Sequence, residues 1–235
     1  MSHTDQAPSA RGGSASTPGA GHWRSYPPLR LDQPLQAALS AFLEFGYHGA
    51  TMRDIAQRAG LSVPGVYHYF SSKQEMLVAI LDLTMDDLLG RSRAARAEGA
   101  DPVARFALLV ECLALFHTQR RELGFVGASE MRSLAPTQRQ RLAAARRAQQ
   151  RMVDEEVEQA CRAGAFATGR PHEASRAVVT MCTALPQWYE PGGDATAEEV
   201  AAQYVQFSLD LMRWTGQGPG LRPVPAQPQD GMEQQ

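Results

Sequence analysis

The sequence predicts an all-α protein with about nine helices. First, apolar residues recur at helical spacing, as in the series Leu35, Leu39, Phe42 and Phe45. Second, proline or capping residues precede such series and glycines follow them, which are the usual start and stop signals of helices. Third, no segment alternates polar and apolar residues convincingly over the length of a strand.

The predicted helices follow one another through the middle of the chain. The first runs from a cap at Asp32 to a stop at Gly46, and three more cover Thr51 to Ala59, Val63 to Phe70, and the stretch from Ser72 to about Leu88. Others begin at Pro102, near Phe125, at Pro136, at Pro171 and after Thr196. Pro186 falls inside the helix that begins at Pro171, where we expect a kink.

The composition excludes several classes of protein. Hydrophobic residues make up 43% and charged residues 20%, which is ordinary for a globular protein. The net charge is -2, so any contact with nucleic acid would require a local patch. Cys112, Cys161 and Cys182 lack metal-ligand spacing, and we expect them to be reduced and buried, with no metal and no cofactor. A polar start and the absence of a long apolar run predict a cytoplasmic protein without membrane contact.

The segment from Thr51 to Phe70 has the pattern of a helix-turn-helix. Thr51 can cap the first short helix, Gly60 can end it in a left-handed turn, and Ser62 can cap the second. Such a unit presents the N-terminal side chains of its second helix to the major groove of DNA. An ordinary helical hairpin is the alternative that spacing alone leaves open.

Three features favour the DNA-binding interpretation. Val63, Pro64 and Gly65 form a low surface that could approach base edges. Tyr67 and Tyr69 would carry hydroxyl groups on the flanks, where phosphates would lie. Lys73 stands in the first turn of the next helix, where its ammonium and free N–H groups could face an anion.

The run from Ala38 to Leu77 resembles the N-terminal domain of the tetracycline-repressor-like (TetR) family. The resemblance covers about 45 residues without a gap and includes the turn, aromatic, lysine and cap positions. It implies backbone anchors at Thr51, Tyr67 and Lys73, and candidates for base or nearby phosphate contact at Arg53, Ser62, Val63, Pro64, Gly65 and His68. For Tyr69 and His68 a solvated surface position is the alternative, and for Arg53 it is an ion pair within the protein.

The composition of the two ends and the resemblance of the middle together predict four segments. They are a disordered tail over 1–30, a helix-turn-helix domain over 31–76, a ligand-binding and dimerisation domain over 77–215, and a flexible tail over 216–235. Arg11, Arg24 and Arg30 in the first tail could belong to a solvated segment or to an arm that touches DNA.

The last two helices are predicted to form a homodimer. Val200, Tyr204, Phe207, Leu211 and Trp214 make an apolar stripe wider than a chain end needs for its own domain. Two helices from each of two chains would make a four-helix bundle and present two reading helices to a palindromic double-stranded DNA operator. Packing within one chain is the alternative for both helices.

The second domain contains the segment Glu130 to Leu134, a polar helix with Arg146, Arg147 and Arg151, the segment Gly164 to Phe166, and the segment Trp188 to Gly193. Together these resemble a TetR subgroup in which the ligand is often an acyl-coenzyme A thioester. This implies a repressor released by a small-molecule effector, with an apolar pocket for an acyl group and arginines for phosphates. The candidate ligand-binding residues are Phe106, Phe116, Phe125, Met131, Arg146, Arg147, Met181 and Trp188. Plain core is the alternative for the apolar candidates, and a solvated helix face is the alternative for the arginines.

Two departures from the subgroup point to a reshaped cavity and keep another hydrophobic or drug-like effector open. Gln187 and Glu190 stand where the subgroup often has arginine, and Pro186 interrupts the same helix. An enzyme is disfavoured, because His117, His172 and the cysteines show no catalytic or metal-type spacing. A helical dimer that binds ligands without DNA is the remaining rival.

Overall fold

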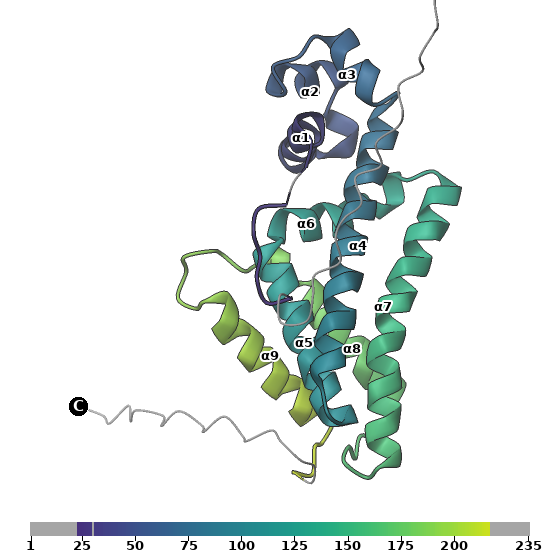
Figure 1. The fold of residues 1–235 in the computed structure, drawn as a ribbon, viewed down its shortest axis with the longest axis vertical. Helices are drawn as coiled ribbons and strands as arrows, with labels where there is room; N and C mark the ends of the chain where they lie inside the picture. Colours follow the sequence, from purple (N-terminus) through teal and green to yellow (C-terminus); the bar gives the residue numbers. More distant parts are fainter. Residues whose placement is uncertain (1–22, 30, 217–235) are drawn as a thin grey trace, which may run out of the picture.

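The computed structural model describes residues 23–29 and 31–216, which form nine α-helices and two short 3-10 helices (Figure 1). They are α1 (Gln33–Gly49), α2 (Met52–Arg58), α3 (Val63–Tyr69), α4 (Lys73–Glu98), α5 (Pro102–Gln119), α6 (Arg121–Ser129), η1 (Glu130–Ser133), α7 (Pro136–Arg162), α8 (Pro171–Thr183), η2 (Leu185–Gln187) and α9 (Ala197–Leu211). The only β-type pairing among these residues is one isolated bridge between Phe166 and Trp214. The predicted all-α class is confirmed. Most of both predicted tails, including Arg11 and Arg30, lies outside the described residues.

Helices α1, α2 and α3 form a small unit at one end of the molecule, and the first turn of α4 completes it (Figure 1). We call this unit the reading head. Phe42, Ile55 and Val66, one from each helix, are at most 2% exposed and make its core. Gly46 interrupts α1 as predicted, but the side chain of Asp32 makes no capping hydrogen bond. Burial of these apolar side chains therefore holds the three short helices together.

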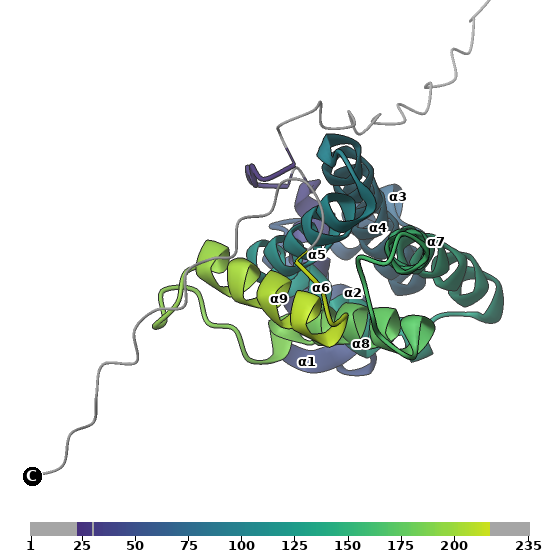
Figure 2. The ribbon, with the colours of Figure 1, turned by 90° about the horizontal axis from the view of Figure 1, so that it is seen from below.

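The remaining helices form a bundle around α5. Its residues Phe106, Leu113 and Phe116 are fully buried, and it packs against α4, α7, α8 and α9. Figure 2 shows these neighbours from below. Because α4 is continuous from Lys73 to Glu98, the predicted boundary between residues 76 and 77 lies inside one helix that joins the reading head to the bundle.

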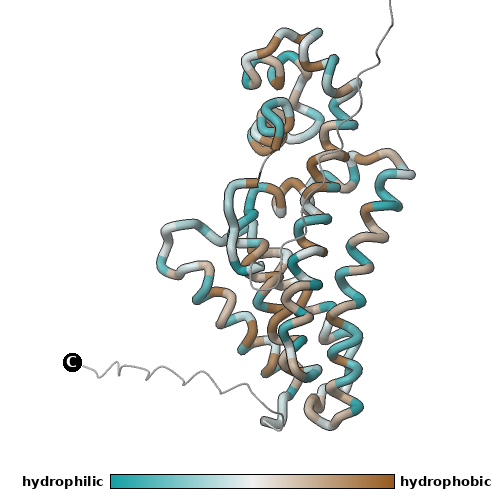
Figure 3. The backbone as a smooth tube through the Cα atoms, in the orientation of Figure 1, coloured by the Kyte–Doolittle hydropathy of each residue, from teal (hydrophilic) through white to brown (hydrophobic). Residues whose placement is uncertain are grey.

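The outer helix α7 is largely hydrophilic along its length, as Figure 3 shows, yet one of its carboxylates is completely buried. Glu156 is 0% exposed and accepts hydrogen bonds from Arg96 of α4 (2.6 Å) and Arg105 of α5 (2.7 Å). A buried carboxylate is stable only when it is paired and hydrogen-bonded. This ion-pair cluster therefore ties three helices together at the end of the bundle far from the reading head.

The segment from Trp23 to Leu29 corrects the prediction of a disordered tail up to residue 30. Trp23 is 0% exposed and packs among residues of α4, α5 and α9, and its Nε1 donates to Glu98 (2.9 Å). Arg91 donates to the carbonyl oxygens of Trp23 (2.7 Å) and Ser25 (2.8 Å). Burial of one large aromatic side chain outweighs the polar composition of the surrounding sequence.

Arg24 also lies on the bundle rather than near DNA. Its guanidinium donates to Glu111 (2.6 Å) and Glu98 (3.2 Å). These hydrogen bonds raise the pKa of Arg24, and the bond to Glu111 has the largest effect. Arg24 therefore does not belong to an arm that extends to DNA from the reading head.

Pro186 ends a helix instead of bending it, which corrects the predicted kink. Helix α8 stops at Thr183, and Pro186 lies in the separate 3-10 turn η2. Proline has no N–H to donate, and its ring clashes with the preceding turn of an α-helix. Tyr189, just after this turn, is buried, and α9 then begins at a capping box of Thr196 and Glu199.

Candidate nucleic-acid interface and ligand cavity

Helix α2 begins with a capping box. The Thr51 hydroxyl oxygen accepts a hydrogen bond from the backbone N–H of Asp54 (3.2 Å), and the Asp54 carboxylate accepts one from the backbone N–H of Thr51 (2.9 Å). The hydrogen bonds from the side chain and backbone of Thr51 hold the pKa of Asp54 below its usual value. Thr51 was expected at the DNA backbone; it is exposed, and its hydroxyl serves this cap.

Gly60 makes the turn between α2 and α3. Its φ of +62° lies in the left-handed region that favours glycine. The N–H of Leu61 donates to the carbonyl oxygen of Ala56 (2.9 Å), which closes α2 in a Schellman arrangement. The Ser62 hydroxyl oxygen accepts from the N–H of Gly65 (3.1 Å) and starts α3. The predicted turn and both predicted caps are confirmed.

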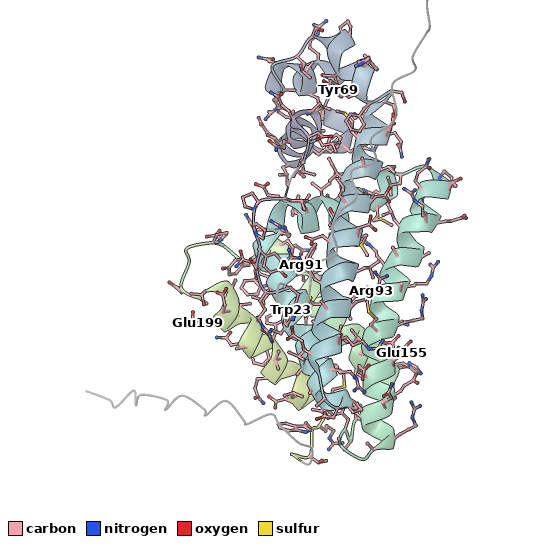
Figure 4. All side chains as sticks on the ribbon, in the orientation of Figure 1. Trp23, Tyr69, Arg91, Arg93, Glu155 and Glu199 are labelled. Atoms are coloured by element: carbon pink, nitrogen blue, oxygen red, sulfur yellow. The ribbon has the colours of Figure 1, made fainter. Side chains whose placement is uncertain are left out.

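The outer face of α3 is exposed at the tip of the molecule, where Figure 4 labels Tyr69. Tyr67 and Tyr69 are 50% and 60% exposed, although tyrosine usually buries most of its ring. Of the other predicted contacts, Ser62, Pro64 and His68 are exposed, and Val63 and Gly65 are half-buried. The fully buried Val66 anchors the helix, so these candidates share one rigid surface.

The two arginines of α2 have different environments. Arg58 donates to the Ser40 hydroxyl (2.8 Å) and to the Glu44 carboxylate (2.5 Å), both on α1. Arg53 is exposed and forms no ion pair within the described part of the chain. The charge of Arg53 therefore remains available to an external anion, whereas that of Arg58 is neutralised.

Lys73 has partners within the chain that the sequence did not predict. Its ammonium donates to the carbonyl oxygens of Tyr47 and Ala50, the latter at 2.6 Å, and lies 4.5 Å from the centre of the Tyr47 ring. Burial lowers the pKa of this half-buried lysine. Two of its three N–H bonds therefore tie α4 to the end of α1, and the expected contact with a DNA phosphate stays a prediction.

Replacing Lys73 by Met should lower the free energy of unfolding by about 1–3 kcal/mol, because two carbonyl groups lose a charged donor. The salt dependence of DNA affinity should stay unchanged if the ammonium is held on the carbonyl oxygens of Tyr47 and Ala50 in the DNA complex as well. Urea unfolding and DNA titrations at several salt concentrations measure both quantities. A salt slope smaller by about one, with unchanged stability, would restore Lys73 to the phosphate contacts.

A cavity of about 530 Å³ lies inside the bundle, between α4, α5, α6, η1, α7 and α8. Four predicted ligand-binding residues line it: Phe116, Met131, Arg146 and Arg147. Leu81, Met85, Leu88, Leu123, Leu142 and Val179 supply further apolar wall. The size and mixed lining are those of a site for a small molecule.

The other four predicted ligand-binding residues do not line this cavity. Phe106 is fully buried and packs against Phe166 (ring centres 5.2 Å apart), so it is core. Met181 packs partly buried against the main core. Phe125 and Trp188 are 41% and 54% exposed on the outer surface. Helical periodicity identified apolar faces correctly but could not show which faces enclose space.

Apart from Arg146 and Arg147, the polar part of the cavity wall was not predicted. Thr84, His117, Gln149, Gln150, Arg176 and Thr183 line it. Burial, with a smaller contribution from the charge of Arg146, lowers the pKa of His117 to about 4, so the ring is neutral at pH 7. In the sequence, the only available signal was a histidine within the apolar run of α5 and a glutamine on the apolar side of α7.

A second hollow, of about 830 Å³, lies on the outside between α1, the α5–α6 junction and the segment around Leu29. Its walls carry Glu44 and Glu122 beside Arg120 and Arg121. The two arginines donate to the carbonyl oxygens of Pro27 and Pro186, respectively. The two arginines therefore already have partners within the protein, and we assign no ligand to this hollow.

The wall of the cavity touches the reading head through η1. Met131 of η1 lines the cavity, while the neighbouring Glu130 accepts a hydrogen bond from the backbone N–H of Tyr47 (3.4 Å). Ser133 lies 3.3 Å from the ring nitrogen Nε2 of His48 and donates to Glu130 (2.8 Å). A displacement of η1 would therefore act directly on the end of α1.

The cysteines are free thiols, as expected. Cys112 and Cys182 are 0% exposed, and burial raises the pKa of both, that of Cys112 to about 12. Cys161 is only half-buried, which corrects the prediction for that residue. Among residues 23–29 and 31–216, no three His, Cys, Asp or Glu side chains gather into a metal-binding group. In the same residues, no helix has the length and apolar character needed to cross a bilayer.

Comparison with known proteins agrees with this architecture. Residues 35–80 match the family model described as bacterial regulatory proteins, tetR family, and residues 99–212 match that of the tetracyclin repressor-like C-terminal domain. The HTH-type transcriptional repressor KstR2 of Rhodococcus jostii (strain RHA1) is 30% identical over 183 residues, which cover 77% of this chain and 90% of that protein. This chain belongs to the tetR family.

Solved structures of tetR-family regulators superpose on most of the chain. KstR2 of Mycobacterium tuberculosis has a TM-score of 0.72 at 26% identity and covers 78% of this chain and 95% of its own. PfmR from Thermus thermophilus has a TM-score of 0.70 at 28% identity, covering 79% and 100%. AibR, solved with isovaleryl coenzyme A and operator DNA, has a TM-score of 0.69 at 23% identity, covering 74% and 95%, which is a likeness of fold. As a tetR-family member, the chain is a DNA-binding transcriptional regulator, and the proteins it matches are regulators rather than enzymes.

Proposed function

We propose that this tetR-family regulator is a homodimeric repressor that binds a palindromic operator and is released by a small hydrophobic effector in the bundle cavity. The observation that carries the proposal is the double role of η1. One of its residues, Met131, lines the cavity, and two others, Glu130 and Ser133, contact the end of α1 in the reading head. Occupation of the cavity and the position of the head are thereby mechanically linked.

The exposed surface of α3, with Arg53 beside it, is the proposed DNA contact. Tyr67, His68 and Tyr69 would flank the groove, and Val63, Pro64 and Gly65 would allow a close approach to base edges. The chain has a net charge of -2, so bulk attraction to DNA is weak and a few contacts must carry affinity. A dimer would double these contacts and so compensate for the weak attraction between the chain and DNA.

Replacing Arg53 by Ala should weaken operator and non-operator DNA alike and should reduce the salt slope of binding by about one, since one phosphate contact is lost. Arg93→Ala is the matched control, because Arg93 is also exposed but lies on α4, well away from α3 (Figure 4). Fluorescence anisotropy at several salt concentrations measures the effect. An Arg53→Ala slope equal to that of the control would exclude a phosphate contact at this residue.

Helices α8 and α9 are the proposed dimer interface. They lie along one side of the molecule (Figure 2), and Trp188, Phe207 and Leu211 leave 54%, 55% and 42% of their surfaces exposed there. Tyr204 stacks on Trp188 with ring centres 6.4 Å apart and an angle of 29°. Large exposed aromatic groups gathered in one place favour a protein–protein contact. A two-fold axis through this face would present two reading heads to half-sites about 34–36 Å apart.

The charge pattern of the cavity favours an effector with an anionic part. Arg146, Arg147 and Arg176 line it, and no aspartate or glutamate does so among the described residues. An acyl-coenzyme A thioester fits this pattern, because its acyl chain would occupy the apolar wall and its phosphates would pair with arginines. AibR, similar to this chain in fold, binds such a thioester. Another hydrophobic or drug-like molecule is the alternative effector.

Release would follow from different affinities of the effector for two positions of η1 and α4. An effector that fits the cavity better when η1 is displaced would move the end of α1 through Glu130 and change the separation of the two heads. A coupling free energy of about 1–3 kcal/mol would weaken operator binding by about 5- to 150-fold.

The proposal is tested by an electrophoretic mobility shift with DNA from upstream of the gene that encodes the chain. We expect a specific complex at moderate salt and its loss on addition of an acyl-coenzyme A thioester found by thermal stabilisation. Absence of any specific complex would exclude the repressor. A complex that persists with the cavity saturated would exclude effector release.

A further inference from the structure

The innermost polar groups of the bundle cavity have no partner within the described residues. Both ring nitrogens of His117 and the side-chain amide nitrogen of Gln149 are buried and make no hydrogen bond there. The two residues are 7% and 4% exposed, and both line the cavity. They stand on different helices, α5 and α7, so the fold is what brings both to the wall of one cavity.

The neighbouring helix α6 packs closely against one side of His117. Gly124 of α6 faces His117, and a Cβ atom at that position would lie 2.9 Å from its Nδ1 and 2.9 Å from Pro186. Arg146, one turn before Gln149 on α7, donates to the carbonyl oxygen of Gly127 (2.5 Å), which holds its guanidinium beside the same wall. Any larger residue at position 124 would push against the imidazole ring.

The two ends of the cavity differ in charge and exposure. We call His117 and Gln149 the buried end, because both are almost fully buried. Burial and the charge of nearby Arg146 lower the pKa of His117, so its ring is uncharged at pH 7. Arg147 and Arg176 are exposed and form a cationic rim. The wall also has apolar residues, with Met85, Leu88 and Phe116 among them.

A purely apolar group at the buried end would be costly. Water can satisfy His117 and Gln149 in the free protein, but a ligand that displaces it must reproduce the hydrogen bonds or lose affinity. Gln149 can offer two N–H donors there, and neutral His117 offers one donor and one acceptor. An oxygen atom that accepts hydrogen bonds is the ligand group that matches both residues.

We propose that the effector carries a keto or hydroxyl oxygen at its buried end, held between His117 and Gln149, in addition to an anionic group at the arginine rim. This rests on the proposed function of the cavity and narrows it to oxygenated amphiphiles, as distinct from plain fatty acyl chains. The free carboxylate of an acid and the phosphates of a coenzyme A thioester are the two sources of the anionic group.

The test compares matched probes in isothermal titration. Decanoate is measured against 6-oxo-, 8-oxo- and 10-hydroxydecanoate, which move the oxygen along one chain, and the series is repeated as coenzyme A thioesters. At least one oxygenated probe should bind about 10- to 100-fold more tightly than its unsubstituted parent in the same series. The series that binds identifies the anionic group.

Variants assign the preference to the two residues. His117→Leu and Gln149→Leu should each reduce the preference for the oxygenated probe to less than about threefold, whereas His117→Gln, which keeps an N–H donor, should retain most of it. The melting temperature of His117→Leu should not fall, because removing a buried polar group without a protein partner is neutral or stabilising.

Three results would overturn the inference: equal binding of decanoate and every oxygenated probe, a preference that survives both leucine variants, or unfolding of His117→Leu, which would make the histidine structural. Failure to bind any probe of either series would also overturn it. The proposed function is judged separately by operator binding and release. A plain acyl thioester that binds and releases the operator would leave that function intact while refuting the oxygenated effector.

Discussion

Replacing Phe207 by Asp should turn the proposed dimer into a monomer and weaken operator binding by about 10²- to 10⁴-fold, because the two heads no longer bind as a linked pair. Phe207 is 55% exposed and contacts Tyr204, with ring centres 6.2 Å apart, at the centre of the apolar face of α9. A carboxylate there would have to be buried without a partner in the dimer. Light scattering after gel filtration and an operator titration measure the two effects.

Ala202→Asp is the control for this substitution. Ala202 is exposed on the same helix, and five residues of helix place it about 140° around the axis from Phe207. It should leave both the mass and the operator affinity unchanged. A Phe207→Asp protein that remains dimeric with full affinity would show that the face of α9 is not the interface.

Replacing Trp23 by Ala should lower the free energy of unfolding by about 3–5 kcal/mol, the range for truncating a large buried aromatic residue. Trp23 is completely buried against the bundle, and its indole N–H is bonded to Glu98. Two carbonyl oxygens of the same segment are held by Arg91. Urea unfolding monitored by circular dichroism gives the difference.

Tyr69→Ala is the control for the loss of an aromatic ring, since Tyr69 is 60% exposed. Its stability should change by no more than about 0.5 kcal/mol. A loss below about 1 kcal/mol for Trp23→Ala would mean that the segment from Trp23 to Leu29 is bound only loosely. The prediction therefore distinguishes a structural segment from an ordinary tail.

The reading head could be predicted because its signals are local. The caps at Thr51 and Ser62 and the left-handed Gly60 act through hydrogen bonds and backbone angles within a few residues. Such interactions depend little on the rest of the fold. The helix count and the TetR resemblance rest on the same kind of signal, which is why both are confirmed by the structure and by the family models.

Two contacts that the sequence did not predict concern residues whose partners are distant in the sequence. Lys73 was expected to face DNA, but its ammonium meets carbonyl groups of residues 47 and 50. Trp23 was placed in a tail, although its neighbours lie near residues 95, 112 and 200. No local pattern marks these contacts, because they depend on how helices cross.

The amino-acid sequence alone was sufficient for the fold class, the helix-turn-helix and the family, since helical period and capping are encoded over short distances. The cavity, its polar end at His117 and Gln149, and the contact of η1 with the reading head emerge only when six elements are packed together. Whether a side chain faces a cavity, the core or solvent depends on its neighbours from other helices. Proposals about the effector and its release therefore depend on the three-dimensional structure, whereas the role of the chain as a tetR-family regulator is evident from the order of its residues.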